Sequence, residues 1–231
     1  MRQEPHCRVG GGRSARSILL RAAGFLLTLV LAACNSIPTD YKGSDAGTVL
    51  VGIGVVKGGY PYSSFALLFR STDEWKGDPA LVPSGRFVFH AMSFFGENKP
   101  DYDSPDEFGV VIASRLRPGN YEVFNFDVFF NGGMVQSNFK SRQPISIPFA
   151  VRPGEAVYLG NYQARSRMGK NVFGLSVPAG AVFAVEDRMD QAVGIAKKKI
   201  PLLPATVANI TPSVQAIANP YFVAPQSPKV D

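Results

Sequence analysis

Carboxylates form the densest cluster of chemically active side chains in this sequence. The acidic stretch DYDSPDE supplies Asp101, Asp103, Asp106 and Glu107, and Glu97 lies a few residues earlier. Two carboxylates can act as general acid and base in glycoside hydrolysis. Their oxygens are also ligands that Ca²⁺ prefers, although the stretch lacks the Gly and the terminal Glu spacing of an EF-hand loop. The stretch reads first as a solvated loop, with a calcium site or a catalytic pair as alternatives.

Histidine and cysteine are too scarce for most other kinds of site. The chain has two of each, and His6 and Cys7 lie near its start, which leaves His90 and Cys34. Zinc and copper centres draw on several His or Cys ligands, which a lone imidazole cannot supply. No Gly-x-Ser-x-Gly elbow accompanies His90, so a Ser-His-Asp triad is not indicated. We therefore expect no cofactor and a structural or surface role for His90.

A short glycine motif, Gly52-Ile53-Gly54, superficially suggests a nucleotide-binding loop. A dinucleotide fingerprint must follow a strand and open a helix, whereas Gly59-Tyr60-Pro61 follows here. The glycines are better explained as small residues within a strand or at a bulge.

The first 33 residues are organised as a signal peptide. Five arginines precede or adjoin the uncharged apolar run 22–33, AAGFLLTLVLAA. That run is shorter than the roughly 20 apolar residues of a spanning helix. Its end, Leu31-Ala32-Ala33-Cys34, resembles the lipobox of bacterial lipoproteins, which implies that Cys34 carries the lipid. An ordinary secretory leader with an incidental cysteine is the alternative, and either leader predicts export.

The lipobox resemblance also implies a location. A residue with two or three acyl chains holds a protein firmly at a bilayer. Asn35 after the cysteine favours the outer membrane under the sorting rule of such lipoproteins. We therefore expect a protein of the cell envelope, anchored by lipid and facing the periplasm.

Removal of the leader changes the charge of the chain. The leader holds five of the 24 basic and one of the 18 acidic side chains, so the mature chain keeps 19 and 17. A net charge of about +2 does not indicate a nucleic-acid partner. With Cys34 acylated, the mature chain also has no cysteine pair for a disulfide, so its stability must come from packing.

The mature chain is patterned as a tether followed by a β domain. Residues 34–47 are polar and contain Pro38, Gly43 and Gly47, which predicts a flexible tether. Strands bounded by turn residues follow, and 121–130 shows the clearest alternation of period two. We predict an antiparallel β-sandwich over 48–200. The expected strands are 48–57, 64–70, 86–95, 108–116, 121–130, 134–140, 145–151, 155–163, 171–177 and 181–186.

Two Pro-Gly turns carry a family resemblance. Arg117-Pro118-Gly119-Asn120 and the RPGE segment at 152–155 place Pro and Gly as a type II turn requires. The stretch LRPGNYEV at 116–123 resembles a segment of transthyretin-like and carboxypeptidase-regulatory-like β-sandwiches. The stretch 151–160 is similar to one in uncharacterised bacterial lipoproteins of that type. The resemblance implies a transthyretin-like or Ig-like sandwich and carries no site.

The C-terminal part breaks the β pattern. Apolar residues at helical spacing predict one short amphipathic helix over 188–199, with Asp187 as its N-cap and Lys197, Lys198 and Lys199 as a solvated last turn. Six prolines in 201–231 then predict an extended or disordered tail. Docking of the tail on a sheet edge or a partner is the alternative.

These features favour binding over catalysis. We expect a non-catalytic envelope lipoprotein that binds a protein or a polymer, with a carboxylate-dependent hydrolase of cell-wall glycan as the alternative. Aromatic residues often anchor partner surfaces, so Tyr60, Tyr62 and Trp75 in turn-rich stretches are the candidate anchors. The competing interpretation is that they cap the sandwich.

Overall fold

The computed structural model describes residues 40–74, 76, 82–92, 99–131 and 136–225. Cys34, the predicted leader, Trp75 and Glu97 lie outside these ranges. Within the part of the chain that is described, no helix is long and apolar enough to cross a membrane.

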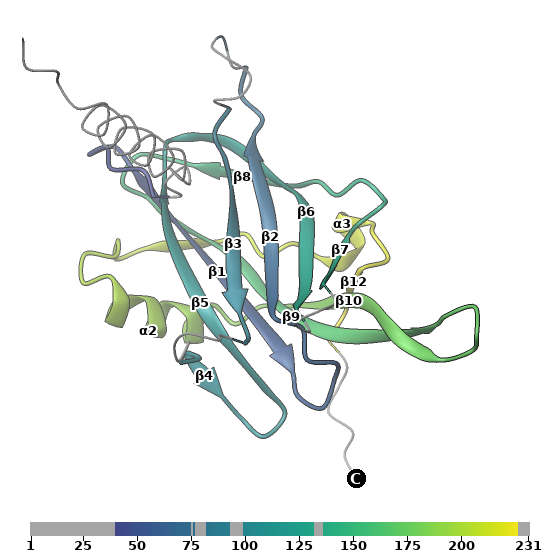
Figure 1. Ribbon diagram of the computed structural model, residues 1–231. Helices are drawn as coiled ribbons and strands as arrows, with labels where there is room; N and C mark the ends of the chain where they lie inside the picture. The colour runs from purple at the N-terminus through teal and green to yellow at the C-terminus, as the bar shows by residue number, and fades with distance from the viewer. Residues whose placement is uncertain (1–39, 75, 77–81, 93–98, 132–135, 226–231) are drawn as a thin grey trace, which may run out of the picture. The chain divides into compact units, whose positions relative to one another are not determined.

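The described chain is mainly β and forms two sheets (Figure 1). Sheet A has the order β12-β10-β9-β1-β5-β4, with β11 beside β9, and sheet B has the order β3-β2-β6-β7, with β8 beside β6. The strands of sheet A are β1 (Gly47–Val56), β4 (Tyr102–Asp103), β5 (Glu107–Leu116), β9 (Ala156–Lys170), β10 (Ser176–Glu186), β11 (Val207–Asn209) and β12 (Phe222–Val223). Those of sheet B are β2 (Ser64–Ser71), β3 (Ser84–His90), β6 (Gly119–Asn131), β7 (Gln136–Lys140) and β8 (Ile147–Val151).

Most strand pairs are antiparallel, and the predicted β-sandwich class is confirmed. Three pairs are parallel: β1 with β9, β11 with β9, and β10 with β12. The parallel pairs join strands that are distant in sequence or that follow a long connection, as parallel pairing requires.

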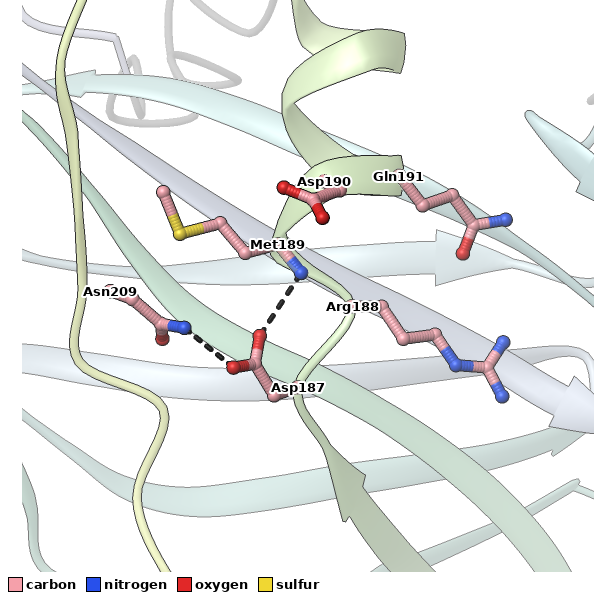
Figure 2. Close-up of a pocket in the computed structure, with 6 residues that line it drawn as sticks. All are labelled: Asp187, Arg188, Met189, Asp190, Gln191 and Asn209. Atoms are coloured by element: carbon pink, nitrogen blue, oxygen red, sulfur yellow. Dashed lines mark hydrogen bonds between the residues drawn. The ribbon is translucent and has the colours of Figure 1, made fainter.

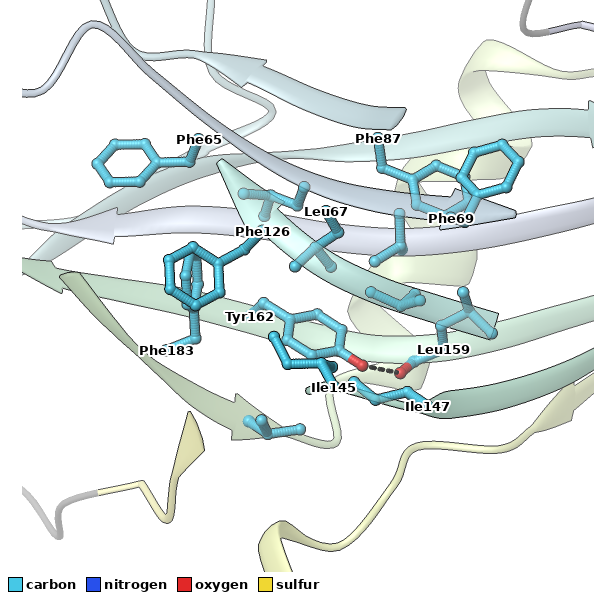
Figure 3. Close-up of a cluster of buried hydrophobic side chains, with 14 of the residues drawn as sticks. Phe65, Leu67, Phe69, Phe87, Phe126, Ile145, Ile147, Leu159, Tyr162 and Phe183 are labelled. Carbon is cyan, nitrogen blue, oxygen red and sulfur yellow. Dashed lines mark hydrogen bonds between the residues drawn. The ribbon is translucent and has the colours of Figure 1, made fainter. Parts of the chain in front are cut away.

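The core lies between the two sheets and follows the two-residue alternation of the strands (Figure 3). In β1 the odd-numbered residues from Val49 to Val55 face sheet B. Sheet B contributes aromatic rings, and Phe69 and Phe87 stack with their centroids 4.6 Å apart. The buried Tyr162 hydroxyl donates to the Leu159 carbonyl oxygen at 3.1 Å. Every long strand therefore places one side in a dry, aromatic-rich core.

The other face of sheet A is covered by α2 (Met189–Lys199). Ala192 and Ala196 of this helix pack on Leu50, Val111 and Tyr158. The predicted helix is thus present, and it begins one residue later than expected. Arg188 is its N-cap, and the carboxylate of Asp187 accepts the N–H of Met189 at 3.1 Å.

The two Pro-Gly turns differ. Gly154 has φ +68°, and Glu155 N donates to the Arg152 carbonyl oxygen at 3.2 Å, so this turn forms as predicted. Gly119 has φ +156° and already belongs to β6, so the prediction of a type II turn at this position is wrong. The physical reason is Asp73, whose carboxylate accepts the N–H of Asn120 at 2.8 Å and holds the chain extended.

The predicted tail is ordered over the described residues 201–225, so the expectation of an unstructured end is wrong there. Its strands β11 and β12 pair with β9 and β10, and between them lies α3 (Val214–Ile217). Val207, Ile217 and Phe222 are buried. The prolines prevent long elements but leave the short apolar segments free to dock on sheet A.

The predicted tether is also shorter than expected. Asp40 accepts the N–H of Arg115 at 3.1 Å, and Tyr41 N donates to the Arg115 carbonyl oxygen at 2.7 Å. Ala46 is buried and Gly47 begins β1. Residues 40–47 therefore belong to the folded domain.

Candidate interaction site at the β9–β10 hairpin

The most distinctive surface feature is the hairpin formed by the ends of β9 and β10. The residues of β9 are buried up to Ala164 and become increasingly exposed from Arg165 to Lys170. Figure 1 shows the hairpin projecting beyond the neighbouring strands. Strands in this part pair only with each other, from Ser166 opposite Ala181 to Lys170 opposite Ser176. The hairpin therefore offers both of its faces to the surroundings.

The end of the hairpin is apolar. Val172 is 94% exposed, Phe173 83%, Leu175 63% and Met168 on the adjoining strand 52%. Single exposed apolar residues are common on protein surfaces, but several gathered at one projecting point indicate an interaction site. We call Met168 and residues 172–175 the hairpin tip.

The turn at the tip is tightly built. The Asn171 side-chain oxygen accepts the N–H groups of Phe173 and Leu175, each at 3.0 Å. The backbone of Asn171 donates to the Leu175 carbonyl oxygen at 3.0 Å, and its own carbonyl oxygen accepts the N–H of Gly174 at 2.9 Å. Gly174 has φ +75°, the left-handed conformation that closes a three-residue hairpin loop. The apolar side chains are thus presented by an ordered turn.

The stem of the hairpin is basic. Arg165, Arg167 and Lys170 are its charged residues, and the 30 residues 156–185 contain no Asp or Glu. Successive side chains of a strand point to opposite faces, so Arg165 and Arg167 lie on one face and Lys170 on the other. Arg167 and Lys170 are exposed, whereas Arg165 is half-buried. Positive charge therefore flanks the tip on both faces.

The segment around Tyr60 and Tyr62 holds the base of the hairpin. The Tyr62 hydroxyl donates to the Gly180 carbonyl oxygen at 2.9 Å and accepts the Gly180 N–H at 2.8 Å. On the other strand, the Ser166 hydroxyl donates to the Tyr60 carbonyl oxygen at 2.9 Å. Gly180, with φ +86°, lies where the pairing of β9 and β10 shifts register. Both strands are thus fixed where the hairpin leaves the sandwich.

This placement corrects one of the predicted anchors. Tyr62 is 1% exposed, and burial raises the pKa of its hydroxyl. It cannot serve as a surface anchor, because its ring packs among Phe65, Phe139 and Tyr60. Tyr60 is half-buried and packs edge-on against Phe130. The alternative, that these tyrosines cap the sandwich, describes both of them, and Trp75 lies outside the described residues.

A cavity of about 300 Å³ lies beside the base of the hairpin. It is lined in part by Phe126, Phe139, Lys140, Arg142, Gly180 and Tyr221. Aromatic walls with a basic rim suit an anionic or sugar-like group. The cavity adds positive charge to the same end of the domain as the hairpin stem.

Three carboxylates of the acidic stretch form ion pairs with three different cationic side chains. Asp101 pairs with Lys199, Asp103 with Lys57 at 2.5 Å, and Glu107 with Arg188. Lys199 also donates to the Val111 carbonyl oxygen at 2.8 Å, so α2 is tied to β5 by this pair. Across the described residues, no group of three or more His, Cys, Asp or Glu is arranged to hold a metal ion. Asp101, Asp103 and Glu107 thus act in this structure as ion-pair partners, whereas Asp106 is exposed.

A buried polar cluster lies on the α2 side of sheet A. The Gln163 amide nitrogen donates to the Tyr102 hydroxyl at 2.7 Å, and this hydroxyl donates to the Asn161 side-chain oxygen at 3.2 Å. Burial raises the pKa of Tyr102 above its usual range. A Cβ at Gly54 would collide with Tyr102 and Gln163, so the predicted strand glycines make room for this cluster. Gly52 and Gly54 form no nucleotide-binding loop, because both lie within strand β1, which continues to Val56.

Arg188 closes the cluster at the start of α2. It pairs with both Glu107 and Glu186, and the Nη2 to Glu107 Oε2 distance is 3.1 Å. Burial works to lower the pKa of Arg188, but the two carboxylates outweigh it and raise the pKa. The charge of this arginine is therefore already balanced within the domain.

A shallow hollow of about 460 Å³ lies at the N-terminus of α2 (Figure 2). The Asp187 carboxylate, within it, accepts from Met189 N at 3.1 Å and from the Asn209 amide at 2.7 Å. Asp190 and Gln191 lie on its rim (Figure 2). These contacts connect α2 to β11.

The remaining sequence candidate, His90, ends β3 on an exposed position. The sequence predicts a strand over 171–177, where Phe173, Leu175 and Val177 fall at every second position, and so misses the turn of the hairpin. The signal that identifies the turn is Asn171 followed three residues later by Gly174.

A comparison of the chain with protein-family models, with curated proteins and with solved structures finds no match.

Proposed function

We propose that this chain is a lipid-anchored protein of the cell envelope that works by binding and uses the β9–β10 hairpin as its contact element. The observation that carries the proposal is the hairpin tip, where Val172, Phe173 and Leu175 are 94%, 83% and 63% exposed. Exposure of this kind is unfavourable for a protein alone in water and becomes favourable when a partner covers it. The leader and the lipobox resemblance support export and attachment through Cys34, at the outer membrane and facing the periplasm.

The position of the hairpin suits this arrangement. Asp40 is held beside Arg115, so the segment between Cys34 and the domain is five residues long and spans at most about 20 Å. The start of β9 pairs with Thr48 at that same end of sheet A. The 15 residues of β9 then carry the chain about 46 Å to the base of the tip. Asp40, where the described chain begins, and the hairpin tip therefore lie towards opposite ends of β9.

Binding is favoured over hydrolysis by the state of the carboxylates. Of Asp103 and Asp106, the two carboxylates on which hydrolysis would depend, Asp103 is paired with Lys57 at 2.5 Å. Asp101 and Glu107 are paired with cations from α2 and its N-cap. A general acid and base must be free to exchange protons with a substrate, whereas these groups connect elements of the fold.

Crosslinking in intact cells tests the binding role. A photoreactive amino acid at position 173 should give a specific adduct, and the same amino acid at Leu202, which is 92% exposed in a loop after α2, should not. Equal adduct yields at the two positions would refute the hairpin as the contact element.

The anchor is tested separately. Labelled palmitate should be incorporated into the parent chain and lost in Cys34→Ser, because the lipid is attached to the thiol. Label that persists in the variant, or never enters the parent, would refute lipidation at Cys34.

A further inference from the structure

We infer that the partner of the hairpin tip is the surface of a phospholipid bilayer that carries anionic headgroups. The inference rests on the proposed function only in taking the hairpin as the contact element. Its first support is the pairing of an apolar end with a basic stem: Phe173 and its neighbours at the tip, then Lys170 and Arg167 behind them. Segments that lie in the membrane interface combine apolar side chains with flanking Lys and Arg in this way.

The distribution of charge favours a bilayer over a protein socket. Arg167 and Lys170 lie on opposite faces of the hairpin, and residues 156–185 contain no carboxylate. A headgroup layer surrounds an inserted hairpin with the same chemistry on every side. The binding surface of a protein partner usually carries both positive and negative charges and contacts only part of the hairpin. Such a partner would not require cations on both faces of the hairpin or the absence of acidic residues.

Three backbone N–H groups of the tip are already hydrogen-bonded within the turn. Polar backbone groups that enter a bilayer must be hydrogen-bonded within the protein. The N–H groups of Phe173 and Leu175 are bonded to the Asn171 side chain, and the N–H of Gly174 to the Asn171 carbonyl oxygen. Behind the turn, β9 and β10 pair with each other from Lys170 and Ser176 onward. The tip can leave water without exposing these donors to the acyl chains.

The spacing along the stem matches the thickness of the interface. Lys170 lies three positions after Arg167, which corresponds to about 10 Å along a strand. The headgroup region on each side of a bilayer is about 5–8 Å thick. With residues 172–175 at the acyl boundary, Lys170 lies at the phosphate level and Arg167 at its aqueous edge.

A fluorescent probe on the exported protein tests the inference. The lipidated chain has no free thiol, so a thiol-reactive, polarity-sensitive dye can be placed at Val172→Cys, leaving Phe173 and Leu175 in place. Leu202→Cys is the matched control, because Leu202 is 92% exposed and Val172 94%. Vesicles of phosphatidylethanolamine with phosphatidylglycerol, and vesicles of phosphatidylcholine alone, are then compared. If Cys34 proves unlipidated, the same variants are made in a Cys34→Ser chain.

We expect the Val172 probe to shift to the blue in the anionic vesicles and to be quenched by brominated acyl chains, with the Leu202 probe unchanged. Partition of the tip should fall at least tenfold in Phe173→Ser with Leu175→Ser, because apolar burial is lost. It should also fall about tenfold in Arg167→Gln with Lys170→Gln, and with added salt.

Several outcomes would overturn the inference. A Val172 probe that responds no more than the Leu202 probe excludes insertion, and an equal response in phosphatidylcholine excludes recognition of anionic headgroups. A protein adduct from position 173 in cells, combined with no vesicle response, would leave the binding role intact and replace the bilayer with a protein partner. Loss of both the adduct and the vesicle response would remove the proposed function as well.

Discussion

The Tyr62 hydroxyl joins the hairpin to the sandwich through two hydrogen bonds to one residue, Gly180. We expect Tyr62→Phe to lower the free energy of unfolding by about 1–3 kcal/mol, because it leaves the buried N–H of Gly180 without its partner. Urea unfolding measures this loss. Tyr60→Phe is the control, since Tyr60 contributes its backbone carbonyl to Ser166 and keeps it in the variant. Equal losses in both variants would contradict the role given to the Tyr62 hydroxyl.

Gly154 is the residue at which backbone conformation alone limits substitution. Its φ is +68°, and a Cβ there would meet no atom within 4 Å. We expect Gly154→Val to cost about 1–3 kcal/mol through strain, and Gly154→Asn clearly less, because Asn tolerates the left-handed region. Thermal melts of the two variants provide the comparison. Equal melting temperatures would show that the turn does not impose this conformation.

For single residues, the sequence predicts the backbone conformation where the residue and its immediate neighbours determine it. Gly154 could be assigned from its Pro-Gly context, because a type II turn needs a positive φ there. Gly119 has the same context and differs because Asp73, far away in sequence, bonds the backbone of Asn120. The role of Tyr62 could not be predicted either, since it depends on a contact with Gly180 more than a hundred residues later.

Among the elements, the C-terminal segment shows how much short strands can contribute. Val207, Ile217 and Phe222 are each buried by docking on sheet A and in the core. Burial of such side chains stabilises a protein by about 1.5–3 kcal/mol each, and the stability of a whole domain is about 5–15 kcal/mol.

A chain truncated after Lys199 should therefore fail to fold or become highly sensitive to protease. Truncation after Pro225 is the control, because it keeps β11, α3 and β12. Limited proteolysis and urea unfolding of the two chains make the comparison. A stable product that ends at Lys199 would mean that the C-terminal segment packs on the domain without contributing to its stability.

The hairpin tip should behave in the opposite way. Phe173→Ser and Leu175→Ser are expected to change the free energy of unfolding by less than about 0.5 kcal/mol, because both side chains already face solvent. Phe183→Ser, in the buried part of β10, should cost about 3 kcal/mol or more. Chemical denaturation of the three variants decides the matter. A large loss at Phe173 would indicate that the tip packs on the domain.

Elements were predictable where the alternation of residues was long and regular. Strand β6 and helix α2 were found within one or two residues of their bounds. The hairpin was missed because Asn171 and Gly174 form a turn inside a stretch whose apolar residues also alternate. The docking of β11 and β12 could not be predicted, because a three-residue or two-residue strand carries no periodicity.

For the whole molecule, buried tyrosines predict sensitivity to alkaline pH. Burial raises the pKa of Tyr158 to about 12 and the pKa values of Tyr102 and Tyr162 above the usual range. A tyrosine in the unfolded chain loses its proton near pH 10, so above that pH the unfolded state is favoured. Stability should be constant up to about pH 9 and then fall, by at most about 1.4 kcal/mol per pH unit for each tyrosine.

Urea unfolding at a series of pH values measures this decline. Tyr162→Phe should reduce its slope, because the variant removes one titrating group from the balance. Stability that stays level or rises above pH 10 would contradict the burial of these hydroxyl groups.

The proposed function of the whole molecule draws only in part on its sequence. The leader and the lipobox resemblance predict where the protein is located. The scarcity of His and Cys reduces the kinds of catalytic and metal sites that the chain could form. The proposed contact element depends on two strands that leave the sandwich together, and on the segment at Tyr60 and Tyr62 that holds their base. Such an arrangement requires three distant parts of the chain to meet, which no local pattern reveals.

The position of β1 has a consequence for the rate of folding. This first strand pairs with β5 on one side and with β9 on the other, although most of the domain lies between Thr48 and Ala156 in the chain. Sheet A is completed only by β12, close to the C-terminus. Such a high contact order places folding in the range of milliseconds to seconds. A chain synthesised from its N-terminus would therefore leave one edge of β1 unpaired after β5 was made, until β9 followed.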